Sequence, residues 1–525
     1  MAGAAKETAT PLEAAAVIVG VAQGGTQAKG IPMSRIATLI LAAGQGTRMK
    51  SQLPKVLHPL CGAPLIAYPL QLAAQMKSET TVLVVGHGRD AVQRAVAQCP
   101  GGDRVRFAVQ TEQRGTGHAV MCALPALKEH DGWMLILSGD VPLLTHRTLQ
   151  RLQRQMQGST APLGFVTFVP GNSAGYGRVV RENDEVRAIV EHRDCTPKQR
   201  AIKEANAGTY LIEAAFLRSA LKKLRQDNAQ NEFFLTDLVA MAAQRGAVPT
   251  VQADEAEVHG INDRVDLAQV ERVLLSQKAQ TLMRNGVTLH DPDTICIHPA
   301  VSVGPDTDIG RGVHITGQSR IGAGCHIEPG VLLHDTVVAD GARVRAYSVI
   351  EGSHIGAGAQ VGPMARLRPG SRLGDNAHVG NWVELKNTVM GDNSKASHLA
   401  YLGDGDIGDN ANIGAGVIFC NYDGYLKHRT TIEEDVFVGS DCQLIAPVTL
   451  HRGAYIASGA TVTHDVPEDA MAIARARQVN RADMGRLFRE RQAAEKALRA
   501  AANESPKARR KSTARPKPPA KGKPR

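Results

Sequence analysis

The sequence has few aromatic residues and no long hydrophobic run. Only 4% of its 525 residues are Phe, Trp or Tyr, whereas Gly occurs 52 times. This composition favours stacked short strands and tight turns over a large aromatic core. No run approaches the roughly 18 apolar residues of a membrane helix. The 43% hydrophobic and 21% charged composition is typical of a soluble globular protein, and the length predicts two or three domains.

Paired cysteine motifs are absent as well. Eight Cys residues are spread over the chain and none forms a CxxC pair. A chain of this size does not need disulfide bonds to hold a core, so we expect a reducing, cytoplasmic setting. Acidic residues are missing from 505–525, which holds nine Lys or Arg. We therefore predict a disordered basic tail. Non-specific contact of this tail with nucleic acid or an anionic surface stays open, and no membrane partner is expected.

The first 32 residues are rich in Ala and Gly. The apolar stretch "AAAVIVGVA" follows Glu13 and lacks a basic flank, so a signal peptide is not expected. We predict a disordered extension over 1–32. Met33 directly precedes a strand pattern and is a candidate start.

Apolar runs and helical patterns alternate from 33 to 262. The runs "IATLILAAG", "TTVLVVGHG" and "WMLILSGDVPLL" are short, and helical periodicity separates them. This alternation predicts βαβ units around a mostly parallel sheet, which binds ligands at the carboxyl ends of its strands. Apolar residues at helical spacing over 264–284 predict a linker helix, assigned to 263–285.

A six-residue period then begins. Apolar residues recur every sixth position in three registers, 297–333, 355–385 and 438–462, and many are followed by Gly. This period is typical of a parallel β-helix with three hexapeptides per coil, predicted over 286–484. Between Leu385 and Ile407 the scan fails. We expect an inserted loop there, presenting His398 and Tyr401. A helix is predicted over 485–504.

The stretch "LAAGQGTRMKSQLPK" follows the first predicted strand directly. Its Gly residues allow close backbone approach to phosphate oxygens, and Arg48 and Lys55 add positive charge. It lacks the GK[ST] ending of a Walker A loop and is not a full GxGxxG dinucleotide fingerprint.

That string resembles the signature of sugar-nucleotide pyrophosphorylases. The resemblance continues through "QTEQRGTGHA", "SGDVPL", "GYGRV", "VEH", "NAGTY", "NAQNEFFLTD" and "GIND". Together with the hexapeptide region, residues 35–480 are similar to the family of bifunctional bacterial N-acetylglucosamine-1-phosphate uridyltransferases/glucosamine-1-phosphate acetyltransferases. The resemblance implies an α/β, Rossmann-like nucleotidyltransferase domain followed by a left-handed parallel β-helix of hexapeptide repeats.

For the first domain, the resemblance implies attack of the sugar phosphate on the α-phosphorus of UTP. It implies catalytic roles for Arg48 and Lys55 and magnesium ligation by Asp140 and Asn262, oxygen donors that suit Mg²⁺. Lys55, Asp140 and Asn262 are also implied to bind the nucleotide-sugar. The other implied binding residues are Leu41, Ala42, Ala43, Gly44, Gln110, Gly115, Thr116, Ser138 and Gly139 for the nucleotide, and Gly177, Glu191 and Asn206 for the sugar.

For the β-helix, the resemblance implies that His398 is the general base of acetyl transfer, a role that suits an imidazole at neutral pH. The implied glucosamine-phosphate and acetyl-CoA residues are Arg368, Lys386, Tyr401, Asn412, Ala415, Asn421, Tyr422, Ser440, Ser458 and Arg475. Arg368 and Lys386 lie 18 residues apart, one full turn of three hexapeptides, so we expect them on one side of the coil. Gln45, Ser138 and Ser458 depart from residues common in the family.

The resemblance further implies acetylation first and uridylyl transfer second, giving UDP-N-acetylglucosamine for peptidoglycan, cell shape and lipopolysaccharide synthesis. A cytoplasmic homotrimer with acetyl sites shared between subunits is implied by analogy alone. Two alternatives stay open. One is a single-function pyrophosphorylase for glucose or mannose nucleotides with a structural β-helix. The other is a non-catalytic subunit that binds sugar nucleotides.

Overall fold

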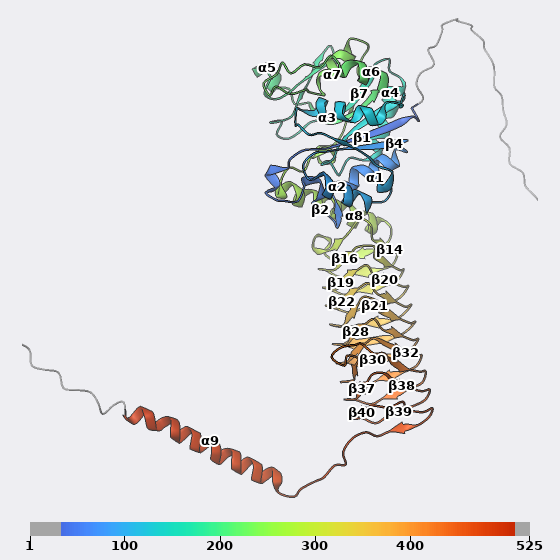
Figure 1. The fold of residues 1–525 in the computed structure, drawn as a ribbon, viewed down its shortest axis with the longest axis vertical. Helices are drawn as coiled ribbons and strands as arrows, with labels where there is room; N and C mark the ends of the chain where they lie inside the picture. Colours follow the sequence, from blue (N-terminus) through green and yellow to red (C-terminus); the bar gives the residue numbers. More distant parts are fainter. Residues whose placement is uncertain (1–32, 510–525) are drawn as a thin grey trace, which may run out of the picture. The chain divides into compact units, whose positions relative to one another are not determined.

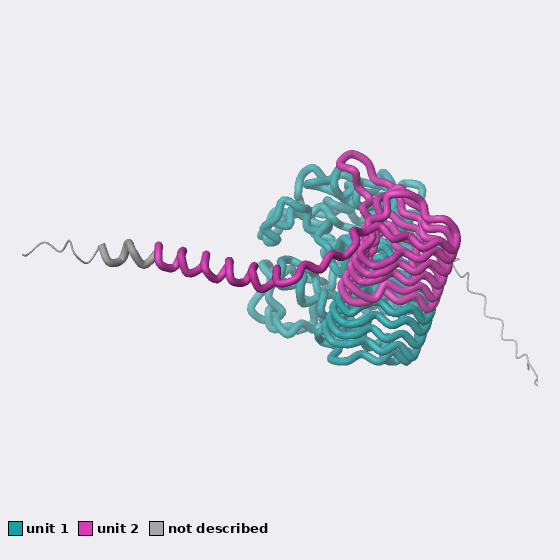
Figure 2. The backbone as a smooth tube through the Cα atoms, turned by 90° about the horizontal axis from the view of Figure 1, so that it is seen from below, with its two compact units in different colours: residues 1–364 teal, residues 365–525 magenta. Residues whose placement is uncertain are grey.

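The computed structural model describes residues 33–509, which fall into two compact units divided between Met364 and Ala365 (Figure 1; Figure 2). The division lies inside the repeat region, so the domain boundaries drawn from the sequence stay a prediction. The prediction for 1–32, and that for the tail from 510 onward, lie outside the described residues. No helix within 33–509 is long and apolar enough to span a bilayer.

The first unit contains a nine-stranded sheet whose main path is β11-β7-β10-β6-β1-β4-β5, with β8 and β9 beside β10. The neighbours β6, β1, β4 and β5 run parallel, whereas β10 runs antiparallel to β6 and β7. The strands are β1 (Ile36–Ala42), β4 (Thr80–Val85), β5 (Arg106–Val109), β6 (Trp133–Ser138), β7 (Leu163–Phe168), β8 (Arg178–Glu182), β9 (Glu185–Val190), β10 (Ala205–Glu213) and β11 (Thr250–Gln252).

Helices cover both faces of this sheet, as its unbroken apolar runs require. Successive residues of β1 divide between two cores: Leu39 belongs to one and Ile40 to the other. The Leu39 core includes α3 (Thr116–Ala123), α6 (Ala214–Leu221) and α7 (Asp237–Ala243). The Ile40 core includes α1 (Ala67–Gln75), α2 (Arg89–Ala97) and α4 (His146–Gln157), while α5 (Pro197–Arg200) is a single turn. The carboxyl ends of β1, β4 and β6 are left for ligands.

The predicted linker helix is confirmed as α8 (Arg264–Arg284). The Asp263 side chain caps it by accepting hydrogen bonds from the backbone of Val265 and Asp266. Its Val270 packs with Leu60 of the hairpin formed by β2 (Pro59–Leu60) and β3 (Ala63–Pro64). Farther along, Lys278 donates to the carbonyl oxygens of Pro299 and Val301 at 3.1 and 2.5 Å, which ties the helix to the first coil.

The hexapeptide region is a stack of short parallel strands that pair with the strand three further along the chain, until β39 pairs with β41 at the end. This is the arrangement of the predicted β-helix, and it is consistent with the left-handed form. In the first unit the strands are β12 (Thr288–Leu289), β13 (Cys296–Ile297), β14 (Ser302–Val303), β15 (Asp308–Ile309), β16 (His314–Thr316), β17 (Arg320–Ile321), β18 (His326–Ile327), β19 (Leu332–His334), β20 (Val337–Val338), β21 (Arg343–Val344), β22 (Val349–Glu351), β23 (His354–Ile355) and β24 (Gln360–Val361).

The second unit continues in the same way and ends in a helix. Its strands are β25 (Arg366–Arg368), β26 (Arg372–Leu373), β27 (His378–Asn381), β28 (Glu384–Lys386), β29 (Val389–Met390), β30 (Lys395–His398), β31 (Tyr401–Gly403), β32 (Gly405–Ile407), β33 (Asn412–Ile413), β34 (Ile418–Cys420), β35 (Thr430–Ile432), β36 (Phe437–Val438), β37 (Gln443–Ile445), β38 (Val448–Leu450), β39 (Tyr455–Ile456), β40 (Thr461–Val462) and β41 (Met471–Ala472). The helix α9 (Met484–Arg509) continues past 504, so a tail beginning at 505 is wrong. The helix-forming residues before that point allow the helix to propagate.

The predicted inserted loop between Leu385 and Ile407 is also wrong. Met390, Ala396 and Leu402 are buried there and continue the inward positions without a gap. The scan fails because the steps from Leu385 to Met390 and from Leu402 to Ile407 are five residues long, which shifts the six-residue frame by one. His398 therefore lies at the end of an ordinary strand, β30.

The insertion that does leave the coil lies farther on. From Phe419 to the next inward residue, Ile432, the chain takes 13 positions, and residues 421–429 form a hairpin outside the coil. All steps other than six after β13 occur at one corner, which we call the variable corner. It is the turn leading into β20, β23, β29, β32 and β35 and, after β40, to Val466, which pairs with Leu450.

Candidate active sites

The glycine-rich loop leaves the carboxyl end of β1 with open backbone. Leu41 accepts a hydrogen bond at its carbonyl oxygen from the backbone of Gly139 at 2.9 Å, which holds the ends of β1 and β6 together. Ala42 and Ala43 are buried, and the Gln113 amide donates to the Ala43 carbonyl at 2.7 Å. A Cβ at Gly44 would meet no atom within 4 Å. The loop therefore offers free backbone to a ligand at this point.

Two cation–acceptor pairs meet at the predicted catalytic centre. The Lys55 ammonium lies 2.5 Å from a carboxylate oxygen of Asp140, and their side chains are 14% and 29% exposed. Arg48 donates to the amide oxygen of Asn262 at 2.9 Å. The backbone of Ile261 donates to the Asp140 carbonyl at 2.9 Å, which joins the two pairs. Segments far apart in the sequence thus converge on one centre.

The donor set of this centre fits a hard divalent cation. Asp140 and Asn262 offer a carboxylate and an amide oxygen, and both already accept hydrogen bonds from cationic side chains. Within 33–509 no group of three or more His, Cys, Asp and Glu could hold a metal ion. A metal bound by one carboxylate, with its other positions filled by water and phosphate oxygens, is how Mg²⁺ is usually held.

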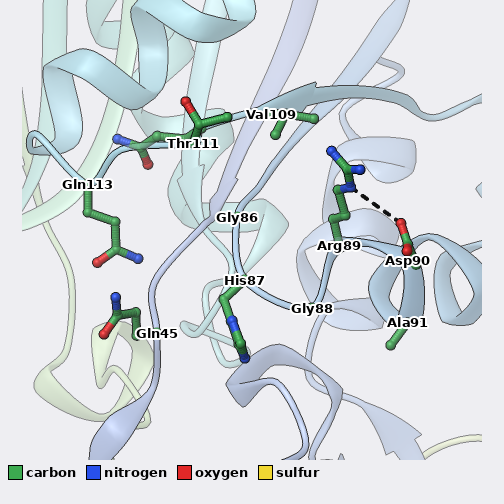
Figure 3. A pocket seen from close by; sticks show the side chains of 11 residues that line it. Gln45, Gly86, His87, Gly88, Arg89, Asp90, Ala91, Val109, Thr111 and Gln113 are labelled. Atoms are coloured by element: carbon green, nitrogen blue, oxygen red, sulfur yellow. Dashed lines mark ion pairs between the residues drawn. The ribbon is translucent and has the colours of Figure 1, made fainter.

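A cavity of about 590 Å³ opens beside the loop, at the carboxyl ends of β4 and β5 (Figure 3). Figure 3 shows Gln45 and Gln113 reaching toward one another along its edge. The buried Gln110 lines it and donates to the Gly115 carbonyl at 3.2 Å. Sequence reasoning missed His87 in this wall. The signal was present, since "GHG" stands at the carboxyl end of a predicted strand.

Gly115 and Thr116 hold the start of α3 against the segment around Phe233. Gly115 has φ +96°, and a Cβ there would lie 2.6 Å from the Phe233 carbonyl oxygen. Thr116 accepts a hydrogen bond from the backbone of Leu235 at 3.1 Å. Gly115 cannot be replaced without moving one of these segments.

The three residues predicted to hold the sugar lie together. The backbone of Asn206 donates to the Gly177 carbonyl at 3.0 Å, and a Cβ at Gly177 would lie 3.4 Å from both carboxylate oxygens of Glu191. Thr236 donates to Glu191 at 3.1 Å. Burial raises the pKa of the Glu191 carboxyl, although this hydrogen bond opposes the shift. Ser138 lies at the end of β6, the strand next to β10. A Cβ added at Gly208 of β10 would lie 3.6 Å from the Ser138 hydroxyl.

A second cluster of charged residues lies on three stacked strands of the second unit. The register pairs Arg368 with Lys386 and Glu384 with Tyr401. The two cations therefore lie on adjacent strands, one full coil apart, as their spacing predicts. Arg368 donates to Glu384 at 3.1 Å.

Asp404 is the hub of this cluster and was missed in the sequence. Its carboxylate accepts hydrogen bonds from Lys386 at 2.9 Å, Asn387 at 2.9 Å and Asn421 at 2.6 Å. Burial would raise the pKa of Asp404, but these donors together lower it. The bond to Asp404 also raises the pKa of Lys386. The cluster thus keeps Lys386 charged although its side chain is only 18% exposed.

Lys427 adds a further cation that sequence reasoning missed. It lies in the 421–429 hairpin, and contact with the Lys386 ammonium lowers its pKa. The charge of Arg368 acts in the same direction. Three cations gathered at one place are suited to an anion such as a phosphate. The sequence signal was weak, because nothing in the hexapeptide pattern shows where an outlying hairpin folds back.

His398 stands at the head of a column on the corner after β30. Its neighbour Leu399 accepts from the backbone of Gly416 at 3.1 Å, the Ala415 carbonyl accepts from Asp441 at 2.7 Å, and the Ser440 carbonyl accepts from Gly459 at 2.8 Å. Arg475 donates to the Ser458 carbonyl. The column formed by His398, Ala415, Ser440, Ser458 and Arg475 brings the predicted base to the predicted acetyl-CoA residues.

Two predicted residues stand apart from these contacts. The side chain of Asn412 lies on β33, whose register pairs Asn412 with Lys395. Tyr422 is exposed on the hairpin, and its hydroxyl donates to the Gly424 carbonyl at 2.6 Å.

The imidazole of His398 is exposed, and it makes no hydrogen bond or ion pair with another residue of the described chain.

Three family models match the chain. They are a MobA-like NTP transferase domain over 38–236, a GMPPB C-terminal domain over 293–379 and a bacterial transferase hexapeptide (six repeats) over 429–464. The chain is also similar to curated proteins that are each named "Bifunctional protein GlmU". The one from Sorangium cellulosum is 47% identical over 451 residues, which cover 85% of this chain and 95% of the relative. Those from Syntrophotalea carbinolica and Geotalea uraniireducens are 49% and 48% identical, covering 84% and 86% of this chain and 95% and 98% of the relatives.

Proposed function

The chain belongs to the GlmU family of bifunctional proteins, and from that premise we propose that it makes UDP-N-acetylglucosamine in two steps. Acetyl-CoA first acetylates glucosamine 1-phosphate on the β-helix. UTP then transfers its uridylyl group to N-acetylglucosamine 1-phosphate in the nucleotidyltransferase domain, and pyrophosphate is released. Glu191, Asn206 and Gly177 would hold the N-acetyl sugar, which is why acetylation comes first.

In the uridylyl step, a phosphate oxygen of the sugar attacks the α-phosphorus of UTP as the bond to pyrophosphate breaks. The reaction needs alignment and charge neutralisation more than a protein nucleophile. Lys55 and Arg48 are the groups that carry positive charge to this centre. Asp140 and Asn262 would hold Mg²⁺, which when bound supplies further positive charge to the phosphates.

The cavity beside the glycine-rich loop would take the nucleotide. Gln110 lies in its wall with its amide already oriented by Gly115. Leu41, Ala42, Ala43 and Gly44 would present backbone to the nucleotide. Thr116, Ser138 and Gly139 would complete the contacts.

In the acetyl step, the amine nitrogen of glucosamine 1-phosphate attacks the thioester carbonyl of acetyl-CoA. A C–N bond forms, the C–S bond breaks, and His398 takes the amine proton and returns it to the departing thiolate. Arg368, Lys386 and Lys427 would grip the sugar phosphate. Tyr401, Asn412 and Asn421 would contact the sugar, and Tyr422 with the column below His398 would bind acetyl-CoA.

The observation that carries the acetyl half is the cluster around Asp404. A β-helix that only supports another domain has no use for a mostly buried carboxylate that keeps a mostly buried lysine charged. This cluster favours the two-enzyme function over a single pyrophosphorylase with a structural β-helix. The cluster also argues against a non-catalytic subunit, because the same chain carries an intact Lys55–Asp140 centre in its first domain.

We further propose a cytoplasmic homotrimer that supplies peptidoglycan and, where present, lipopolysaccharide synthesis. An exposed His398 imidazole without a partner in the described chain supports a site that a neighbouring subunit completes. The cytoplasm is where the proposed nucleotide and acetyl-CoA substrates are found.

The test is mass spectrometry of the full chain with glucosamine 1-phosphate, acetyl-CoA, UTP and Mg²⁺, omitting each component in turn. We expect UDP-N-acetylglucosamine only when all four are present. Product that appears only with pre-acetylated sugar would show that the β-helix does not acetylate. No product with either sugar would contradict both halves.

A further inference from the structure

The 421–429 hairpin is fastened to the coil at both ends. At its start, Asn421 donates to Asp404 at 2.6 Å. At its end, Arg429 pairs with Asp406 and donates to the Gly405 carbonyl at 3.1 Å. Within the hairpin, Tyr422 and Lys427 form an antiparallel bridge, and the backbone of His428 donates to the Asn421 carbonyl at 2.8 Å. The Tyr422–Lys427 bridge therefore lies directly next to the Asn421–His428 pair, whose Asn421 is held by Asp404.

The tip of the hairpin is shaped by one carboxylate. Asp423 accepts hydrogen bonds at Oδ1 from the backbone of Tyr425 at 2.7 Å and of Leu426 at 2.6 Å. Its Oδ2 lies 2.7 Å from Nε2 of His428. A single side chain thus joins both strands of the hairpin across the turn, in the manner of an Asx-turn.

Hydrophobic packing does little to hold the tip of the 421–429 hairpin. Tyr425 and Leu426 are 92% and 64% exposed as whole residues, so they bury too little surface to hold the turn. Gly424 adopts φ +100°, a conformation that Gly reaches freely but does not enforce. Two other bonds cross the turn: the Tyr422 hydroxyl donates to the Gly424 carbonyl at 2.6 Å, and the Asp423 backbone donates to the Leu426 carbonyl at 3.2 Å. The Asp423 carboxylate, with its three contacts, makes the largest share of the bonds that hold the chain leading into Lys427.

We propose that Asp423 is a positioning residue for amino-sugar phosphate binding. Its carboxylate fixes the turn, the turn fixes the Tyr422–Lys427 bridge, and the bridge directs the Lys427 ammonium to the cluster of Arg368 and Lys386. The proximity of Lys427 to Lys386 agrees with this chain of contacts. This inference rests on the acetyl transfer proposed above.

The test separates KM from kcat in the acetyl reaction of the full-length chain. Asp423→Ala should raise the KM for glucosamine 1-phosphate about tenfold, equal to about 1.4 kcal/mol, and leave kcat nearly unchanged. Asp423→Asn keeps an oxygen that can accept from both backbone amides, so it should recover most of the affinity. An unchanged KM in Asp423→Ala, or an Asn variant as impaired as the Ala variant, would overturn the inference.

Asp335 offers a matched control in the first unit. Its carboxylate also accepts from a backbone amide, that of Gln318 at 2.8 Å, and pairs with a histidine, His334, at 3.1 Å. Asp335→Ala should leave the KM for glucosamine 1-phosphate at the wild-type value. A rise equal to that of Asp423→Ala would mean that any such loss disturbs the coil, and would refute a specific role for Asp423.

A double-mutant cycle with Lys427 completes the test. If Asp423 acts through Lys427, Asp423→Ala should raise KM no further in a Lys427→Ala background. Additive effects would refute the mechanism. Uridylyl transfer measured in each variant reports whether the first domain is folded, and an unchanged kcat of acetyl transfer reports the same for the β-helix. Absence of acetyl transfer in the wild-type chain would contradict the proposed function itself, whereas normal wild-type turnover with an insensitive KM would contradict this inference alone.

Discussion

The carboxylate of Asp404 should contribute more to stability than the exposed carboxylate of Asp406, two residues along the chain. Asp404→Ala leaves Lys386 without its counter-ion and removes an acceptor from Asn387 and Asn421. The side chains of Lys386 and Asp404 are only 18% and 12% exposed, so water replaces little of what is lost. Breaking such a pair by removing one partner costs about 3–5 kcal/mol. At about 2–4 °C per kcal/mol for 150–250 residues, the Tm should fall by roughly 6–20 °C.

The comparison is with Asp406→Ala, two residues away. Asp406 pairs with Arg429, but these side chains are 47% and 41% exposed. An exposed pair contributes about 1 kcal/mol or less, so this variant should melt within a few degrees of the wild type. The assay is scanning calorimetry of the full chain at pH 7, following the transition of the β-helix. The double variant Asp404→Ala/Lys386→Ala should lose less than the sum of the single losses, because it leaves no buried charge alone.

Acid should erase the difference between Asp404→Ala and the wild type. The folded-state pKa of Asp404 is lowered by its donors. Its contribution to stability is therefore complete above the unfolded pKa of about 3.9 and is lost as the pH falls through the folded value. If Asp404→Ala lowers Tm no more than Asp406→Ala at pH 7, or if the difference persists in strong acid, the reasoning from burial is refuted.

Further predictions concern both sites. Asp140→Asn should abolish uridylyl transfer and spare acetyl transfer, and His398→Asn should do the reverse; loss of both activities in either variant would indicate misfolding or a wrong assignment. Burial raises the pKa of Glu191, so the folded chain holds a proton that is lost as the pH rises and stability falls through that range. The difference in Tm between Glu191→Gln and the wild type should therefore move in favour of the variant as the pH rises above the unfolded pKa of about 4.3, a trend that calorimetry can check. Gly115→Ala should destabilise the first domain by about 1–3 kcal/mol, because a Cβ would lie 2.6 Å from a backbone oxygen at φ +96°; an unchanged unfolding midpoint in urea would contradict this.

The sequence predicts well what depends on local period. The apolar runs of β1, β4 and β6 and the helix α8 are found where the pattern places them. Six-residue spacing also predicts that Arg368 and Lys386 lie on adjacent strands, and the register pairs them. Such properties follow from the chain alone, because the period fixes which residues share a face.

The sequence fails where the length of a turn matters. A five-residue step moves the frame by one position, so Met390 and Ala396 fall outside a rigid six-residue scan although both are buried. A small residue such as Ala396 gives little hydrophobic signal even where the coil needs an inward side chain. The six-residue scan for this reason predicts a loop at His398, whereas the residue lies at the end of strand β30 and its neighbours in the column form an ordinary corner.

Contacts between distant turns could not be read from the sequence either. Asp404 is one of many Asp residues that follow Gly in the repeats, and only the fold shows that it receives three donors. Lys386 lowers the pKa of Lys427, an effect between residues that only the fold of the hairpin brings into range. Lys55 and Asp140 were each identified, but their 2.5 Å contact depends on how a loop after β1 crosses the end of β6.

At the variable corner, this architecture tolerates both the insertion and the deletion of residues. Five-residue steps remove a residue there, and the 13-position step into β35 adds a whole hairpin, yet the inward residues Phe419 and Ile432 stay buried. The other two corners keep their six-residue steps throughout the coils after β13. Segments inserted at the variable corner should therefore leave the coil intact. This corner is where a β-helix can gain or exchange catalytic and binding residues without losing its core.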